Sequence, residues 1–176
     1  MVVITLLSIV SALALPSFTQ TIARYRLLRA SEDLIATLYL ARSEAIRRGS
    51  PHILIERSTP SDCAAASITG RWDCGWNIYL TSAAQGKSKS AAESAADGEN
   101  KGDSVNRELL HTTARFKRVE ISHNNKQAQI ALNRWGDLGI HGFGLKALTS
   151  KGELLRAICV EGAGRIRTVN GSATCQ

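Results

Sequence analysis

The stretch Met1-Val-Val-Ile-Thr-Leu-Leu-Ser-Ile-Val-Ser-Ala-Leu-Ala-Leu15 contains no charged side chain and is followed by Pro16. The helical spacing of apolar residues continues past this proline as far as Gly49-Ser50-Pro51. A glycine followed by a proline is a typical helix end. We therefore expect one helix over residues 1–48. At 1.5 Å per residue it is roughly 70 Å long, more than a compact domain covers, so its beginning must project.

The uncharged beginning of this helix needs an apolar environment. As a helix, 15 residues span about 22 Å, whereas a bilayer crossing takes about 20 apolar residues. Two environments fit: a membrane, or the core of a bundle of identical helices. A secretory signal peptide fits less well, because no Lys or Arg precedes the apolar run and the helical pattern continues behind it. We assign residues 1–15 to a transmembrane or filament-core part.

Residues 16–48 have the pattern of an amphipathic helix. Apolar side chains recur at intervals that place them on one face, with charged residues between them. The predicted face consists of Ile22, Leu28, Ile35, Leu38, Ala41 and Ala45, broadened by Leu27, Leu34 and Ile46. This part of the helix is expected to be the spine onto which the rest of the chain packs.

From His52 onward the apolar pattern changes to alternation or short apolar runs, which predicts strands. The predicted strands are His52–Arg57, Trp76–Thr81, Arg107–Thr112, Arg118–Ser122, Gln127–Leu132, Gly142–Leu148, Leu154–Val160 and Arg165–Val169. Consecutive strands without intervening helices indicate a mostly antiparallel arrangement. The expected fold class is α+β, a long N-terminal helix packed on a C-terminal β-domain at 49–176.

Two segments interrupt the strands. Ser58–Cys74 is a polar loop. Ser82–Ser104 is rich in Ala, Ser, Gly, Lys and Glu and has no large apolar residue, so it cannot bury enough surface to order itself. We predict a flexible loop at 82–104.

The four cysteines, Cys63, Cys74, Cys159 and Cys175, form an even set without a Cys-x-x-Cys pair. Zinc ribbons and thioredoxin-type sites need closer spacing, so neither is indicated. Two disulfides in an oxidising compartment fit better. Three pairings are possible; we favour Cys63–Cys74 with Cys159–Cys175 because each closes a short loop.

Nothing in the sequence indicates an enzyme, a metal site or a cofactor. The histidines are scattered without ligand spacing, and no nucleophile elbow, phosphate-binding glycine loop or paired-carboxylate motif is present. The net charge of +7 is uneven, with +1 in residues 1–104 and +6 in residues 105–176. A one-sided basic excess favours polyanionic partners.

A two-arginine pattern stands near the C-terminus, in Cys159-Val-Glu-Gly-Ala-Gly-Arg-Ile-Arg-Thr-Val169. Gly162 and Gly164 flank a predicted tight turn. In the strand that follows, Arg165 and Arg167 share one face, about 6.6 Å apart, while Ile166 points the other way. Guanidinium groups bind phosphates well. Two arginines on the outer face of an edge strand can also serve only to discourage aggregation.

The sequence resembles known families at both ends. Met1 to Arg24 is similar to the N-terminal helix of type IV pilins and secretion pseudopilins, in which a proline stands near the position of Pro16. In that family a Phe-Thr-Leu-Ile-Glu-Leu segment and a basic leader precede the Met-Val-Val seen here, so we expect both upstream of Met1. Arg71-Trp-Asp-Cys-Gly-Trp-Asn-Ile-Tyr79, Cys159 and Gly164-Arg165-Ile166-Arg167 resemble the C-terminal domain of FimT minor pilins and GspH pseudopilins.

The resemblance implies a minor type IV pilin that binds extracellular DNA for uptake in natural transformation. Its Gly-Arg-x-Arg motif implies DNA binding by Gly164, Arg165 and Arg167. Basic residues expected to support them are Arg118, Lys117 and Lys146, with Arg115, Lys151 and Arg156 as further candidates, and Trp72, Trp76 and Trp135 are candidates for base stacking.

Other pilins, and the bacterial inner membrane before assembly, are the further partners that the resemblance implies. The β-domain would be periplasmic at first and then part of an extracellular pilus. The alternative is a structural minor pilin or GspH-like type II secretion pseudopilin that primes or caps a filament without binding DNA.

Overall fold

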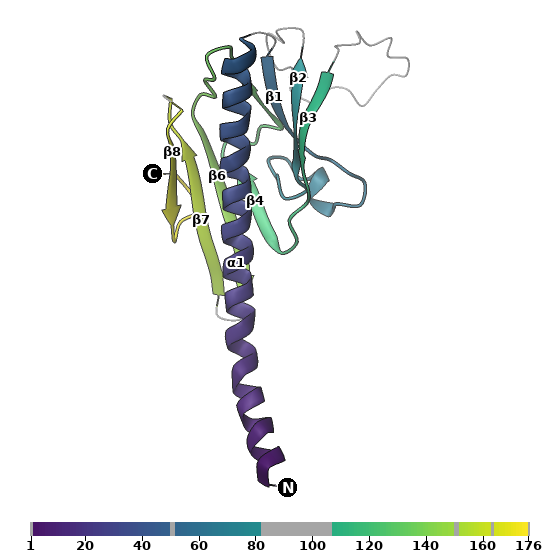
Figure 1. Cartoon of the computed structure of the whole chain (residues 1–176), viewed down its shortest axis with the longest axis vertical. Helices are drawn as coiled ribbons and strands as arrows, with labels where there is room; N and C mark the ends of the chain where they lie inside the picture. The colour runs from purple at the N-terminus through teal and green to yellow at the C-terminus, as the bar shows by residue number, and fades with distance from the viewer. Residues whose placement is uncertain (1, 50–51, 82–106, 150–151, 163, 176) are drawn as a thin grey trace.

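The computed structural model of the chain describes residues 2–49, 52–81, 107–149, 152–162 and 164–175 (Figure 1). A single helix, α1 (Val2–Arg48), precedes eight strands and one short 3₁₀ helix, η1 (Ala64–Ser67), in these residues. The N-terminal half of α1 extends away from the β-domain, whereas its C-terminal half lies against the strands (Figure 1). The predicted flexible loop at 82–104 lies outside the described residues.

The end of α1 has the expected chemistry. Arg47 and Arg48 place cations in the last turn, where they complement the helix dipole. Gly49 adopts a left-handed conformation with φ +64°, and its N–H donates to the carbonyl of Ala45 at 3.0 Å. Among the described residues, no helix combines the length and the apolar character needed to cross a membrane.

Small side chains dominate the buried face of α1. This face runs through Ala23, Leu27, Ala30, Leu34, Leu38, Ala41 and Ala45, each at most 9% exposed. Its spacing of three and four residues is that of one helix face. The alanines leave room for the helix to approach the strands closely.

The predicted face was displaced from the observed one. Leu27, Leu34, Leu38, Ala41 and Ala45 are buried as expected, but Ile22, Leu28 and Ile46 are exposed and Ile35 is half-buried. The two faces differ because alanines, and not the largest apolar residues, occupy much of the contact with the strands. Close packing against a sheet favours alanine, so several larger side chains lie at the edge of the contact.

Eight antiparallel strands form two four-stranded sheets. The first has the order β3-β2-β1-β5 and consists of β1 (His52–Arg57), β2 (Trp76–Thr81), β3 (Arg107–Thr113) and β5 (Gln129–Leu132). The second has the order β4-β6-β7-β8 and consists of β4 (Val119–His123), β6 (His141–Thr149), β7 (Gly152–Val160) and β8 (Ile166–Asn170). Helix α1 packs chiefly on β6 and β7 and also contacts β1, β4 and β5. The α+β fold class is therefore confirmed.

All eight predicted strands are present, with small differences at their ends. Arg118 was expected to begin a strand but has φ 64°, so β4 begins at Val119. Gln127 precedes β5, which begins at Gln129, and Arg165 precedes β8.

The core between α1 and the sheets contains two fully buried tryptophans. The Trp76 indole N–H donates to Thr37 Oγ1 on α1 at 2.9 Å, and the Thr37 hydroxyl donates to the carbonyl of Asp33 at 2.8 Å. The Trp72 indole N–H donates to the carbonyl of Gln127 at 3.0 Å. Both rings therefore combine apolar burial with a satisfied polar group.

Two disulfides fix the irregular segments, in the pairing that the sequence favoured. Cys63–Cys74 closes the loop between β1 and β2, and Cys159–Cys175 holds the C-terminal segment against the second sheet. This segment lies so close to β6 that a Cβ on Gly144 would overlap the carbonyl oxygen of Ala173. Glycine in β6 thus makes room for the C-terminus.

We predict that Gly75→Ala lowers the free energy of unfolding by at least about 3 kcal/mol. Gly75 has φ +91°, and a Cβ would overlap the carbonyl oxygen of Thr113, so strain and a steric clash add. Gly49→Ala is the control, because Gly49 also has positive φ but no atom within 4 Å of an added Cβ. The control should lose only about 1 kcal/mol. Urea unfolding followed by tryptophan fluorescence measures both, and equal losses would contradict the packing argument.

Candidate nucleic-acid interface

The two-arginine motif lies at the turn between β7 and β8. The Glu161 N–H donates to the carbonyl of Arg165 at 3.0 Å, and the Gly164 N–H donates to the carbonyl of Glu161 at 2.7 Å. Gly164 is buried and has φ +74°. Since β8 is an edge strand of its sheet, the turn and the strand after it are open on one side.

Arg42 of α1 holds this turn in place. Its Nη1 donates to the Gly164 carbonyl at 2.9 Å, across 122 positions of sequence. A Cβ at position 164 would overlap that same guanidinium group. The positive φ favours glycine at this position, and any larger residue would also displace the Arg42 guanidinium group from its contact. Sequence reasoning missed Arg42, because nothing in a mid-helix arginine indicates a contact so distant in sequence.

Arg165 and Arg167 are both exposed, and they differ in their partners. Arg165 has no ion-pair partner among the described residues. Arg167 lies opposite Cys159 of β7, and its Nε is 3.5 Å from Glu161 Oε1. Both members of this pair are close to half exposed, so the pair contributes less than about 1 kcal/mol. Ile166 packs against the core, as the alternation predicted.

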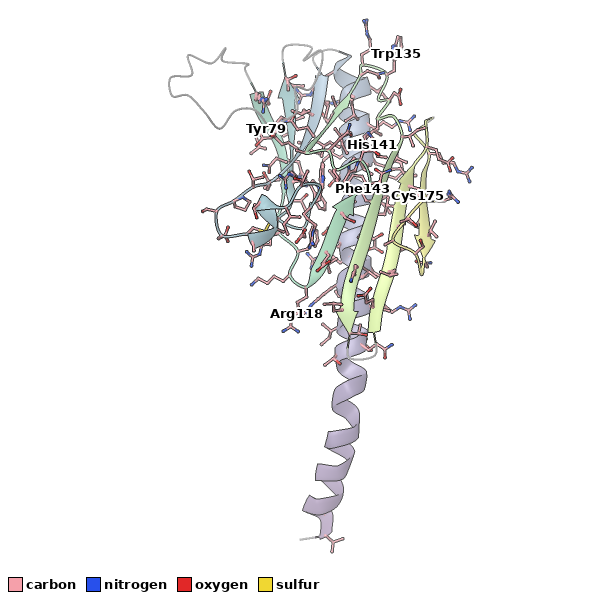
Figure 2. All side chains as sticks on the ribbon, turned by 180° about the vertical axis from the view of Figure 1, so that it is seen from behind. Tyr79, Arg118, Trp135, His141, Phe143 and Cys175 are labelled. Atoms are coloured by element: carbon pink, nitrogen blue, oxygen red, sulfur yellow. A yellow bond between two sulfur atoms is a disulfide. The ribbon has the colours of Figure 1, made fainter. Side chains whose placement is uncertain are left out.

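The supporting cations predicted from sequence lie elsewhere. Lys117 and Arg118 precede β4, the opposite edge of the sheet from β8. Val119, at the start of β4, pairs with Ala147 of β6. Ile166, at the start of β8, pairs with Val160 of β7, which in turn pairs with His141 of β6. His141 and Ala147 are six residues apart along β6, a distance of about 20 Å. Figure 2 shows Arg118 near the projecting half of α1 and Trp135 at the opposite end of the β-domain.

Lys146 is also unavailable as a neighbour of the arginine pair. Its Nζ forms an ion pair with Glu153, and the hydrogen bond to Glu153 is the main reason why the pKa of Lys146 is raised. Lys117 and Arg115 instead border a groove between α1 and the β3–β4 connection, together with Arg26 and Arg29. Lys151 lies outside the described residues. The structure therefore separates the predicted cations into two regions.

The three tryptophans differ in how far their side chains are buried. Trp72 and Trp76 are completely buried and cannot stack on a ligand, whereas Trp135 is 75% exposed. Trp135 belongs to the connection between β5 and β6, residues 133–140. This connection is adjacent to the β7–β8 turn, because a Cβ on Gly162 would lie 3.9 Å from Ile140 Cγ1.

Two buried histidines anchor the same connection. The Gln127 N–H donates to His123 Nδ1 at 3.2 Å, which leaves the His123 proton on Nε2, 3.0 Å from His141 Nδ1. His141 Nε2 then donates to the carbonyl of Leu138 at 2.7 Å. Burial, and secondly the neighbouring His141, lower the pKa of His123 to about 4, and burial lowers the pKa of His141. Both rings are therefore neutral at pH 7.

A long N-terminal helix packed on two antiparallel sheets is the architecture of pilin-like proteins. The crystal structure of the type IV minor pilin FimU from Pseudomonas aeruginosa PAO1 is similar, with a TM-score of 0.52, 20% sequence identity, and coverage of 86% of this chain and 92% of that chain. FimU in a second crystal form gives a TM-score of 0.49 at 18% identity, over 81% of this chain and 91% of that chain.

A comparison of the sequence with protein-family models identifies the family of this chain. The family model described as type II transport protein GspH matches residues 30–172, which include nearly the whole β-domain and most of the packed part of α1. This chain belongs to the GspH family. No curated protein matches its sequence.

We predict that the histidine pair makes the fold sensitive to mild acid. The pKa of His123 is about 4 in the folded chain and about 6.5 when unfolded. Its contribution to stability is therefore complete above pH 6.5 and is lost as the pH falls from about 6.5 to about 4. The pKa difference of about 2.5 units corresponds to at most about 3.5 kcal/mol, at about 1.4 kcal/mol for each unit. The free energy of unfolding should therefore fall by about 3 kcal/mol between pH 7 and pH 4. Urea unfolding across pH 4–7 measures it.

His123→Gln is the comparison for that experiment. It removes the titrating ring, so the difference in stability between the two proteins should shrink as the pH falls. A constant difference from pH 7 to pH 4 would contradict the assignment.

Proposed function

We propose that this chain is a minor pilin that enters a type IV pilus through α1 and binds DNA through Arg165 and Arg167, for uptake in natural transformation. Membership of the GspH family and the pilin-like fold support the first part. The second part rests on one observation: two exposed arginines stand at a firmly held turn on an edge strand.

Exposed apolar residues of α1 outside its buried face support the proposed filament entry. Val2, Val3, Ile22 and Tyr25 are 72, 69, 44 and 65% exposed. Such a surface is unfavourable in water and favourable against the helices of identical or related subunits. Before assembly, the same surface would be held in the bacterial inner membrane with the β-domain in the periplasm. Two disulfides are consistent with that oxidising compartment.

The charge and the position of the two arginines support the proposed DNA binding. Phosphate contacts by arginine need no particular base sequence, and each contact releases a counterion, so the affinity falls with salt. Arg42 and the glycine turn hold the backbone under Arg165, which limits the entropy lost on binding. Glu161 opposes binding, because it stands beside Arg167.

A structural subunit that primes or caps a filament without binding DNA is the second candidate. The observation that favours it is the separation of Lys117, Arg118 and Lys146 from the arginine pair, which leaves a small cationic site.

We predict that Ile22→Asp with Tyr25→Asp prevents incorporation into pili. The change puts two charges on the exposed face of projecting α1, where they would be desolvated in the filament core. The amount of this chain in sheared pili, measured by immunoblot, should fall at least about tenfold. Ile68→Asp is the control, since Ile68 is 49% exposed but lies on the β-domain. Normal incorporation of the double variant would contradict the assembly role.

We predict that Arg165→Ala with Arg167→Ala lowers the affinity for duplex DNA at least about tenfold at low salt. The dependence of log affinity on log salt should become shallower by about two, because two phosphate contacts are lost. Fluorescence anisotropy of a labelled duplex, with the full chain in a neutral detergent, measures both quantities.

Two variants make that measurement specific. Lys117→Ala with Arg118→Ala removes the same charge from the far end of the domain and should change the affinity much less. Glu161→Gln should raise it a few-fold, because Arg167 loses its carboxylate partner. Equal losses in the two double variants would show binding to overall charge, and no binding by the wild-type chain would leave only the structural candidate.

A further inference from the structure

The β5–β6 connection presents two large apolar side chains to solvent. Trp135 is 75% exposed and Ile140 is 72% exposed, although both other tryptophans of the chain are fully buried. Figure 2 shows Trp135 at the end of the β-domain away from the projecting part of α1. Two large apolar side chains exposed on one short connection make it a candidate surface for contact with a partner.

The backbone that carries Trp135 is held firmly. Asn133 Oδ1 accepts the N–H groups of Trp135 at 2.9 Å and Asp137 at 3.1 Å. The Gly136 N–H donates to the carbonyl of Asn133 at 2.9 Å, and Gly136 has φ +72°. This is an Asx-type turn, in which the side chain replaces a backbone partner. Trp135 is therefore presented at a defined position.

The same arginine side chain contacts this turn and the two-arginine turn. A Cβ on Gly136 would lie 2.8 Å from Cγ of Arg42, whose guanidinium group donates to the carbonyl of Gly164. Ile140 and Gly162 form a second contact between the two segments. Trp135 and Arg165 consequently stand on neighbouring segments fixed to one point of α1.

One cation contacts the Trp135 ring, and the same turn also carries the carboxylate of Asp137. Arg134 Cζ lies 6.0 Å from the centroid of the Trp135 ring, within the range of a cation–π interaction. An exposed aromatic ring beside cations that bind phosphate is the usual arrangement for single-stranded nucleic acid, in which bases stack on the ring. In a duplex the base faces are covered by neighbouring bases and cannot reach it.

We propose that Trp135 stacks on an unpaired base of a DNA strand whose phosphates are bound by Arg165 and Arg167. This inference rests on the proposed DNA binding and names its ligand: the site prefers single-stranded DNA, or the frayed end of a duplex, over a blunt duplex. Ile140 is a second exposed apolar side chain of the same connection, and Arg134 adds a cation to it.

The test compares Trp135→Ala with the wild-type full chain in a neutral detergent. The two probes are an oligothymidine strand and a blunt two-strand duplex that is closed by G·C pairs at both ends and has the same total number of nucleotides. The wild-type chain should bind the single strand more tightly. Trp135→Ala should lower the affinity for the single strand at least about fivefold and leave the affinity for the duplex within about twofold. Trp135→Phe keeps a stacking ring and should retain most of the affinity.

A fluorescence titration gives an independent readout. Stacking should quench the emission of Trp135, and Trp135→Ala, which keeps only the buried Trp72 and Trp76, should show no quenching. If Trp135→Ala leaves the affinity for the single strand unchanged while Arg165→Ala with Arg167→Ala lowers it, the stacking inference is wrong and DNA binding stands. If the wild-type chain binds neither probe, both proposals fall; loss of pilus incorporation by Trp135→Ala would then assign the ring to a neighbouring pilin.

Discussion

The structure depends on the burial of one face of α1 against both sheets. The first and second sheets share no strand, and α1 contacts strands of both. Alanines at positions 23, 30, 41 and 45 let the helix approach closely, and Leu27, Leu34 and Leu38 fill the space between. Removing apolar surface from water is the main favourable term in such packing. Because the contact uses only the C-terminal half of α1, the other half is left free to project.

Helix packing also decides the geometry of the candidate site. Arg42 lies at the border of the buried face, where its stem packs on Gly136 and its guanidinium group reaches Gly164. One side chain of the spine thus fixes two surface turns that are distant in sequence. A motif of four residues near the C-terminus is positioned by a residue of the N-terminal helix. The glycine in that motif serves the fold as well as the turn, so its presence by itself does not indicate a ligand.

The fold places the positively charged residues of the chain in separate regions of the surface. One group, Arg165 with Arg167, lies at the β8 edge, and another, Arg115 with Lys117, borders a groove beside α1. The second sheet separates β8 from β4, so the two groups cannot act on one short ligand. The net charge of +7 therefore overstates the potential at either place. Glu161 and Glu153 reduce it further by pairing with Arg167 and Lys146.

The sequence by itself determined the elements and their covalent links. The extent of α1, the eight strands to within a few residues, the α+β class and the disulfide pairing all follow from local signals: apolar period, helix-ending glycine and short loop closure. The inward position of Ile166 followed from the alternation of a strand.

Only the tertiary structure decided which face of α1 is buried and that Trp135 alone of the three tryptophans is exposed. It also decided that Arg42 supports Gly164. The positions of Lys117, Arg118 and Lys146 relative to the arginine pair likewise depend on the order of the strands. The physical reason is that these properties depend on contacts between segments far apart in the chain. The periodicity of apolar residues indicates which side chains share a face of a helix or strand. The order of the strands and the close packing of the elements decide which residues that face contacts.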